Sequence, residues 1–505
     1  MYLPHDILYS IFGTLDGSDL KSTRLVSQTW RACASVFLFR EIHVSSAKED
    51  LDIFQKVAQD PLLNKYVWHL KYDATQFVRP ITKQQYIQKL YSQTRWKYYC
   101  GTTSWKSDDS EVDEWMNDVL SHRLSEHDAV EKFKTYRFIQ WGYHLYQKQA
   151  SFQHAVMSNG KFLEGLTQGL VGLQKLRSVI FEVSWNYESR LGDRRCGSYF
   201  ARHWPYYYSC PDHGRMGIGL HANHISSRSE LRAPDGVESV RAITHALSQA
   251  GSQITSFDVV NPGGCSPPGL SPSFFGMSEF PTRLKSRDLE MAIGAMSHLE
   301  RCVLHFASCM DKPFDDPSTP EQFPSLAGLQ AMLNSMECLR HLELRFPDEY
   351  TEQPRMYNVN EILPRGKIWP SMRSLILVSV TATAEELLNI ILCHTPDLRS
   401  LGIGNINLAD GSWEDFFEAL AQSKKLVRLR FERCGYLFHR NGEIFPLYDG
   451  IENYVVSGGR SPCLADDEPN SAAGKFLPGF VPTIQNRLAL RGPRSWLELV
   501  CWRGG

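Results

Sequence analysis

Apolar residues in this chain recur in a short pattern: one apolar residue, two free positions, a second apolar residue, one free position and a third. The last two lie two residues apart, which places their side chains on one face of an extended strand. The pattern predicts nine short strands. Their apolar triplets are Phe39/Ile42/Val44, Val67/Leu70/Tyr72, Leu176/Val179/Phe181, Ile254/Phe257/Val259, Leu299/Cys302/Leu304, Leu339/Leu342/Leu344, Met372/Leu375/Leu377, Leu398/Leu401/Ile403 and Leu426/Leu429/Phe431.

The spacing of the triplets carries more weight than the triplets themselves. Because 42% of the residues are apolar, about 35 chance matches are expected in a chain of this length. The last three triplets begin 26 and 28 residues apart, and leucine-rich repeats have a period of about 20 to 29 residues. This regularity favours a repeat array.

Amphipathic helices are predicted between the strands. Thr383 and Glu386 have the spacing of a capping box ahead of an apolar helix face, and Ser412 and Asp415 stand in the same relation. The segment 162–173 carries apolar residues at helical spacing. Alternating strands and helices imply parallel strands joined by crossovers. Since one strand and one helix cannot cover their own apolar face, the units stack into a curved solenoid.

The predicted fold class is therefore α/β, with a leucine-rich-repeat-like solenoid (horseshoe) over residues 46–435. Long gaps between the early strands predict loop inserts at about 80–160, 184–235 and 261–288, the first of which holds a helix around Ile139 and Leu145. Residues 436–505 are rich in Pro, Gly, Ser and charge, which predicts a loop-rich C-terminal tail or cap.

The N-terminal segment has a different, helical pattern. Ile7, Ile11 and Leu15 recur every fourth residue with Leu8 beside them, which predicts an apolar stripe along a first helix. Pro4 suits the start of that helix, because the N–H that proline lacks would have no partner there. The apolar stripe must be buried against something.

Two further short helices are predicted within the first 45 residues. Ser18 or Asp19 can cap a second helix that carries Leu20, and Ser27 can cap a third that carries Trp30. A unit of this size buries too little surface to be stable by itself, since chains below about 40 residues usually need a metal, disulfides or a partner. A partner is therefore expected.

This segment resembles the F-box. The residues that match its pattern are Leu3, Pro4, Asp6, Ile7, Ile11, Leu15, Asp19, Leu20, Arg24, Val26, Ser27, Trp30 and Arg31. Known F-boxes dock on a Skp-type adaptor that hangs from a cullin, so the resemblance implies a substrate receptor of a ubiquitin ligase, similar to fungal F-box proteins with divergent leucine-rich repeats. The adaptor-binding residues that it implies are Leu3, Pro4, Ile7, Leu8, Ile11, Leu15, Leu20, Val26 and Trp30.

Substrate contacts are expected on the concave face, where the residues between the buried strand positions point. The candidates are His341, Glu343, Arg345, Arg428, Arg430 and Glu432. The same face would hold Ser374, Ile376, Val378, Ser400, Gly402 and Gly404. Arg345, Arg428, Arg430 and Arg433 together suit an acidic or phosphorylated protein segment, because Arg pairs with phosphate bidentately. The alternative is a solvated charged face.

Composition limits the classes of partner and the cellular compartments that we expect for this chain. Lys plus Arg number 54 against 56 Asp plus Glu, so no overall basic field favours nucleic acid or anionic lipid. No apolar run is long enough for a membrane span, and Pro4 and Asp6 stand where a secretory signal needs a basic region and an apolar core. Twelve cysteines without a CxxC pair suit reduced thiols. We expect a cytoplasmic or nuclear location.

Candidate chemistry is sparse. The most metal-like cluster is Cys196, His203, Cys210, His213, His221 and His224, which has zinc-ligand spacings but not those of a usual finger, and which reads equally well as an aromatic loop. Catalytic motifs such as a nucleophile elbow or Walker loop are missing from the sequence. We expect no catalytic activity, cofactor or metal. Two alternatives remain open: a scaffold that uses a Skp-type adaptor outside a ligase, and a zinc module or metal-dependent enzyme around Cys210 and His213.

Overall fold

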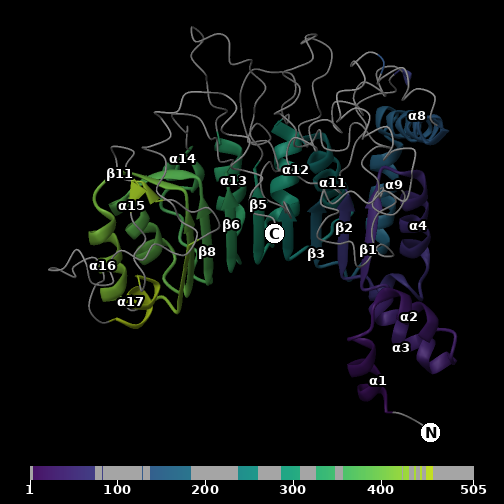
Figure 1. The fold of residues 1–505 in the computed structure, drawn as a ribbon, viewed down its shortest axis with the longest axis horizontal. Helices are drawn as coiled ribbons and strands as arrows, with labels where there is room; N and C mark the ends of the chain where they lie inside the picture. Colours follow the sequence, from purple (N-terminus) through teal and green to yellow (C-terminus); the bar gives the residue numbers. More distant parts are fainter. Residues whose placement is uncertain are drawn as a thin grey trace.

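A nine-stranded parallel sheet forms the body of the protein. The computed structural model describes residues 4–73, 82–83, 128, 137–182, 237–259, 286–306, 326–346, 357–423, 425–431, 437–438, 444–445 and 451–458. The strands stand side by side in chain order (Figure 1). They are β1 (Glu41–Ser45), β2 (His69–Asp73), β3 (Ser178–Glu182), β4 (Ser256–Val259), β5 (Arg301–His305), β6 (His341–Arg345), β8 (Ser374–Val378), β10 (Ser400–Gly404) and β12 (Arg428–Phe431). Each predicted triplet lies at one of these strands, which confirms the α/β fold class.

The strands pair in register, so that equivalent apolar residues form two rows across the sheet. The first row is Ile42, Leu70, Val179, Phe257, Cys302, Leu342, Leu375, Leu401 and Leu429. The second is Val44, Tyr72, Phe181, Val259, Leu304, Leu344, Leu377, Ile403 and Phe431. The residues of both rows belong to one continuous core, and within the two rows only Phe431 is partly exposed. Burial of these rows is the main stabilising contribution of each repeat.

Helices cover the face of the sheet that carries these rows. They are α4 (Lys48–Gln59), α9 (Lys161–Gly172), α11 (Val237–Gln249), α12 (Ser286–Met296), α13 (Ala327–Ser335), α14 (Val359–Ile362), α15 (Ala384–Asn389) and α16 (Trp413–Ser423). Neighbouring helices pack against each other from α4 to α14 and from α15 to α16. The predicted capping box of Thr383 and Glu386 is confirmed, and the Ser412 hydroxyl accepts a hydrogen bond from the Asp415 backbone N–H at 3.0 Å.

Two elements extend this layer at the β1 end. A short 3-10 helix spans Asn64–Tyr66 ahead of β2. The longer helix α8 (Arg137–Ser158) contains the Ile139 and Leu145 positions of the predicted insert helix and packs against α9 (Figure 1). The first insert therefore adds a helix that packs against α9.

A second sheet, which the sequence did not predict, follows the main one near its C-terminal end. It has the order β14-β13-β11-β9-β7. Its strands are β7 (Tyr357–Asn358), β9 (Val380–Thr383), β11 (Ile406–Asp410), β13 (Leu437–Phe438) and β14 (Ile444–Phe445). The chain turns from β8 into β9 at Ser379 and from β10 into β11 at Asn405, both buried and both with positive φ, 60° and 49°. These corners use the left-handed conformation, which Asn tolerates better than most residues.

The last described helix packs against the end of the solenoid. Helix α17 (Ile451–Ser457) contacts α16 and β12 and buries Ile451 and Val455 in the main core. Part of the predicted C-terminal segment thus covers the final repeat, which would otherwise expose apolar surface. Most of residues 436–505, and most of the three predicted inserts, lie outside the described residues.

Two helix glycines provide a matched test of the packing. A Cβ at Gly172 in α9 would overlap the carbonyl oxygen of Ala58 in α4, whereas a Cβ at Gly294 in α12 would meet nothing within 4 Å. We expect Gly172→Ala to lower the free energy of unfolding by about 1–3 kcal/mol through overpacking. Gly294→Ala should raise it by about 0.5–1 kcal/mol through helix propensity. Denaturant unfolding of the full chain measures both, and equal effects would contradict the close approach of α4 and α9.

Candidate functional site

The N-terminal residues form the three predicted helices, α1 (His5–Phe12), α2 (Gly17–Thr23) and α3 (Gln28–Leu38). The Ser27 hydroxyl caps α3 as predicted, accepting from the Trp30 N–H at 3.2 Å. The predicted cap of α2 was wrong. Asp16, rather than Ser18 or Asp19, caps this helix, because α2 begins at Gly17 and the Asp16 carboxylate accepts from the N–H groups of both residues at 2.8 Å.

This unit has a small core of its own, separate from that of the solenoid. The buried residues are Leu8, Phe12, Leu20, Cys33 and Ala34, with Leu15, Trp30, Phe37 and Leu38 packed around them. The Trp30 ring meets Phe12 edge-on, with ring centroids 5.4 Å apart. Of the predicted adaptor-binding residues, Leu8 and Leu20 are therefore inside the unit, and Leu15 and Trp30 are half-buried at its margin.

The other predicted residues lie on the surface of the unit. Ile7 and Ile11, four residues apart on α1, are 47% and 43% exposed. Val26, just after α2, is 62% exposed, and its neighbour Leu25, which sequence reasoning missed, is 81% exposed. Pro4 is exposed as well, whereas Leu3 lies outside the described residues. Helix α1 thus carries two apolar faces, of which the one with Ile7 and Ile11 stays about half-exposed.

The three-helix unit joins the solenoid without a long linker. Phe39, between α3 and β1, packs against the main core, and the Arg24 guanidinium lies 5.1 Å from the centre of its ring. At the start of β1, the Glu41 carboxylate lies 2.7 Å from Lys71 Nζ and 3.3 Å from His43 Nε2. Burial raises the pKa of Glu41, but hydrogen bonds from His43 and Lys71 outweigh it and hold the pKa at about 2. This ion pair ties β1 to β2 beside the unit.

Three of the predicted substrate-contacting residues form one charge cluster on β6. Arg345 Nε donates to the Glu343 carboxylate at 2.5 Å, and His341 Nε2 lies 3.7 Å from it. His305 on β5 adds a contact of 2.9 Å to the same carboxylate. Burial raises the pKa of Glu343, but the hydrogen bonds from His305 and Arg345, together with the nearby His341 ring, hold it far below its usual range. The predicted use of Arg345 as a free cation for a target is not favoured, because this charge is already paired.

The remaining predicted contacts lie apart from this cluster. Arg428 and Arg430 are exposed on β12, three strand steps from β6 or roughly 14 Å. The residues between them on β8 and β10 are less accessible than predicted. Ile376, Val378, Gly402 and Gly404 are buried, and Ser374 and Ser400 are half-buried. Glu432 and Arg433 lie outside the described residues. The predicted contacts therefore do not form a single open surface.

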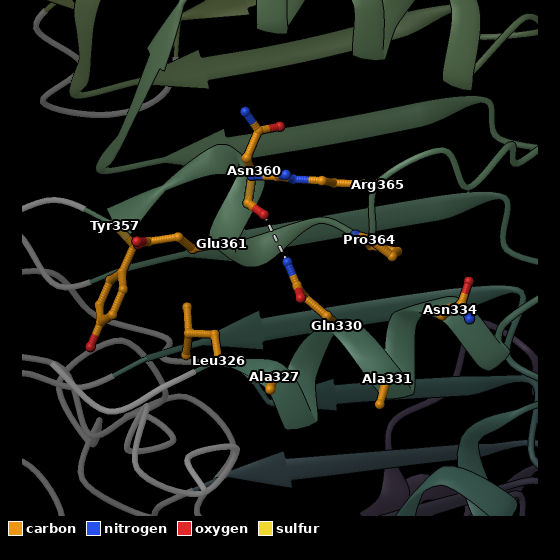
Figure 2. A pocket seen from close by; sticks show the side chains of 10 residues that line it. All are labelled: Leu326, Ala327, Gln330, Ala331, Asn334, Tyr357, Asn360, Glu361, Pro364 and Arg365. Carbon is orange, nitrogen blue, oxygen red and sulfur yellow. Dashed lines mark hydrogen bonds between the residues drawn. The ribbon is translucent and has the colours of Figure 1, made fainter. Parts of the chain in front are cut away.

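A groove of about 720 Å³ lies between α13 and α14, on the helical side of the sheet. Its lining residues are Leu326, Ala327, Gln330, Ala331, Asn334, Tyr357, Asn360, Glu361, Pro364 and Arg365 (Figure 2). The Gln330 side-chain amide crosses it and donates to the carbonyl oxygens of Asn360 at 2.8 Å and Leu363 at 3.3 Å. These hydrogen bonds link the two helices, so Gln330 has a structural role in the groove.

Neither a metal centre nor a membrane helix occurs among the residues that the structure describes. Within these ranges, no group of three or more His, Cys, Asp or Glu side chains is placed to hold a metal ion. The predicted cluster from Cys196 to His224 falls outside them and stays a prediction. The described helices also include none with the length and apolarity needed to cross a bilayer.

The paired state of Glu343 predicts a pH-dependent contribution to stability. With its folded pKa far below the ordinary value of 4.5, the carboxylate stabilises the fold above about pH 4.5, and this contribution is lost as the pH falls. We expect Glu343→Gln to lower the free energy of unfolding by about 1–3 kcal/mol at pH 7. The difference from the wild type should shrink below pH 4.5, as measured by denaturant unfolding at several pH values.

The control is Glu300→Gln, which breaks an exposed ion pair with Arg340 at 3.2 Å. Such pairs contribute only about 0–1 kcal/mol, so this variant should change little at any pH. A Glu343→Gln effect that stays constant from pH 7 to pH 3 would rule out the proposed charge cluster.

The comparison with known families agrees with this geometry. Residues 1–45 match the F-box-like family, over the same stretch that folds into α1, α2 and α3. No curated protein matches the chain. F-box proteins are typically non-catalytic adaptors, an F-box implies binding of a Skp-type adaptor, and the domain is typical of the substrate-recognition subunits of Skp-cullin-F-box ligases. The chain thus carries an F-box-like domain at residues 1–45, followed by a long parallel sheet with repeat-like helices.

Proposed function

We propose that this chain is the substrate-recognition subunit of a Skp-cullin-F-box ubiquitin ligase. The F-box-like unit binds the Skp-type adaptor, the solenoid holds a target protein, and the cullin-bound machinery supplies the chemistry. The observation that carries this proposal is the coincidence of the F-box-like match with a helix that keeps Ile7 and Ile11 exposed.

The adaptor interface follows from the two faces of α1. Ile7, Ile11, Leu25 and Val26 expose 43 to 81% of their surface, and full burial of one such side chain contributes about 1.5–3 kcal/mol. Docking of an apolar helical surface on these residues would therefore be favourable. Leu8 and Leu20 act indirectly in this proposal, because they hold α1 and α2 in place from the inside.

The solenoid acts through proximity. A target bound to it is tethered to the charged ubiquitin carrier, which converts a rare encounter into an effectively intramolecular one. The predicted target contacts that the structure describes are His341, Glu343, Arg345, Arg428 and Arg430, all on the sheet. Among them, Arg428 and Arg430 are the exposed ones, and we propose that they contact the target directly.

The adaptor interface is tested by the double variant Ile7→Ala/Ile11→Ala. We expect it to weaken adaptor binding by about 10-fold or more, since buried apolar anchors dominate interface energies. The unfolding free energy should change by less than about 1 kcal/mol, because both side chains are half-exposed in the free chain. Isothermal titration calorimetry with purified Skp-type adaptor measures the affinity.

The matched control is Ile53→Ala/Leu62→Ala, which removes apolar side chains of similar exposure, 45% and 67%, from the solenoid. It should leave adaptor binding unchanged. If the Ile7/Ile11 variant bound as tightly as this control, the proposed interface would be wrong. Purification of the wild-type chain from cells should yield adaptor and cullin together, and adaptor without cullin would favour a scaffold outside a ligase.

A further inference from the structure

A row of arginines lies along one edge of the main sheet, at the positions that precede its last strands. The N–H of Arg373 donates to the carbonyl of Arg340 at 2.8 Å, and the N–H of Arg399 donates to that of Arg373 at 3.0 Å. Val427 continues the ladder, with its N–H 2.8 Å from the Arg399 carbonyl oxygen. These hydrogen bonds fix one position per strand, at the strand spacing of about 4.8 Å.

Two further arginines lie on the last strand, one and three positions after Val427. Arg428 lies opposite Ser400 in the register, and Arg430 lies opposite Gly402. Arg373, Arg399, Arg428 and Arg430 are all exposed, and we call them the arginine ridge.

The charges of the ridge are unpaired, unlike those of the nearest other arginines, which lie on or just before β5 and β6. Arg301 binds Asp258 at 3.0 Å, Arg340 binds Glu300 at 3.2 Å, and Arg345 binds Glu343. In the described part of the chain, none of the four ridge residues forms an ion pair. Asp397, two residues before Arg399, is exposed and makes no such pair, and Glu432 lies outside the described residues.

We infer that the arginine ridge binds a phosphorylated, acidic segment of the target protein. This inference rests on the proposed function and adds the chemistry of the target. Guanidinium groups bind phosphate and carboxylate bidentately. The summed positive potential of four unpaired arginines also steers an anionic segment toward the ridge before contact. In an extended segment, every second side chain lies about 6.6 Å further along. This spacing is wider than the strand spacing of about 4.8 Å, and the long arginine side chains can span the difference, so phosphoserines at alternate positions can each reach an arginine of the ridge.

The ridge lies at the same edge of the sheet as the F-box-like unit. Helix α3 leads directly into the start of β1, and all strands of the main sheet are parallel and in register, so the residues before each strand share one edge (Figure 1). β1 and β12 are eight strand steps apart, or roughly 38 Å along the sheet before curvature. A segment on the ridge would lie on the adaptor side of the solenoid, which suits delivery to the ligase.

The test uses a fluorescein-labelled nine-residue peptide of alternating glycine and phosphoserine. Two comparison peptides carry serine or glutamate in place of phosphoserine. We expect the full chain to bind the phosphoserine peptide, with an affinity that falls as salt rises. The variant Arg373→Gln/Arg399→Gln/Arg428→Gln/Arg430→Gln should lose about 10-fold or more of that affinity. Fluorescence anisotropy measures binding, and adaptor binding, measured in parallel, should be unchanged.

The control variant Lys161→Gln/Lys175→Gln/Arg287→Gln/Arg365→Gln removes the same charge from exposed sites elsewhere. It should keep the peptide affinity within about 2-fold. Equal losses in both variants, or no binding by the wild type, would overturn the inference. So would equal, ridge-dependent binding of a single-stranded oligonucleotide of the same charge, which would indicate a general polyanion surface. Failure of adaptor binding would overturn the proposed function instead, without changing the peptide result.

Discussion

The in-register alignment of two apolar rows is the constraint on which the structure depends. Each strand offers the core two inward residues, such as Leu342 and Leu344 on β6, and only the neighbouring strands and their helices can cover them. A slip of one residue would turn these side chains to the opposite face. The rows therefore fix the register, and the register in turn places the residues before every strand at one edge of the sheet.

The F-box-like unit buries some of its apolar side chains and leaves others exposed. With about 40 residues it can bury only a small set of apolar side chains, and the set that it buries includes Leu8, Phe12 and Leu20. Ile7 and Ile11, on the other face of the same helix, are left outside. A helix with one buried apolar face and a second that stays half-exposed is suited to a partner. The separate core lets this surface be used without disturbing the solenoid.

Much of the fold was predictable because its signals are local. The triplet pattern located all nine strands of the main sheet, and the side-chain caps at Thr383, Ser412 and Ser27 marked helix starts. The second sheet was missed because three of its strands have only two residues, and the other two follow turns at Ser379 and Asn405, whose backbone conformation no periodicity reveals. The α2 cap was misplaced by two to three residues because Asp16, Ser18 and Asp19 are all of residue types that favour this position.

The candidate site was only partly predictable from the sequence. The pattern gave the face on which a strand residue lies, but pairing and burial depend on neighbours far along the chain. Glu343 and Arg345 lie two apart, so their pairing could have been expected, whereas the contribution of His305 from the next strand could not. Arg373 and Arg399 were missed because they precede the strands, and only the backbone ladder shows that they are adjacent.

In the proposed complex, the outer face of the F-box-like unit binds the adaptor, while the solenoid keeps its structure and its surface for a target. Hydrogen–deuterium exchange of the full chain can be compared with and without purified Skp-type adaptor. We expect slower exchange confined to residues 4–38, with the strands from β2 to β12 unaffected. Protection that falls on the solenoid and leaves α1 and α2 unchanged would contradict this proposal.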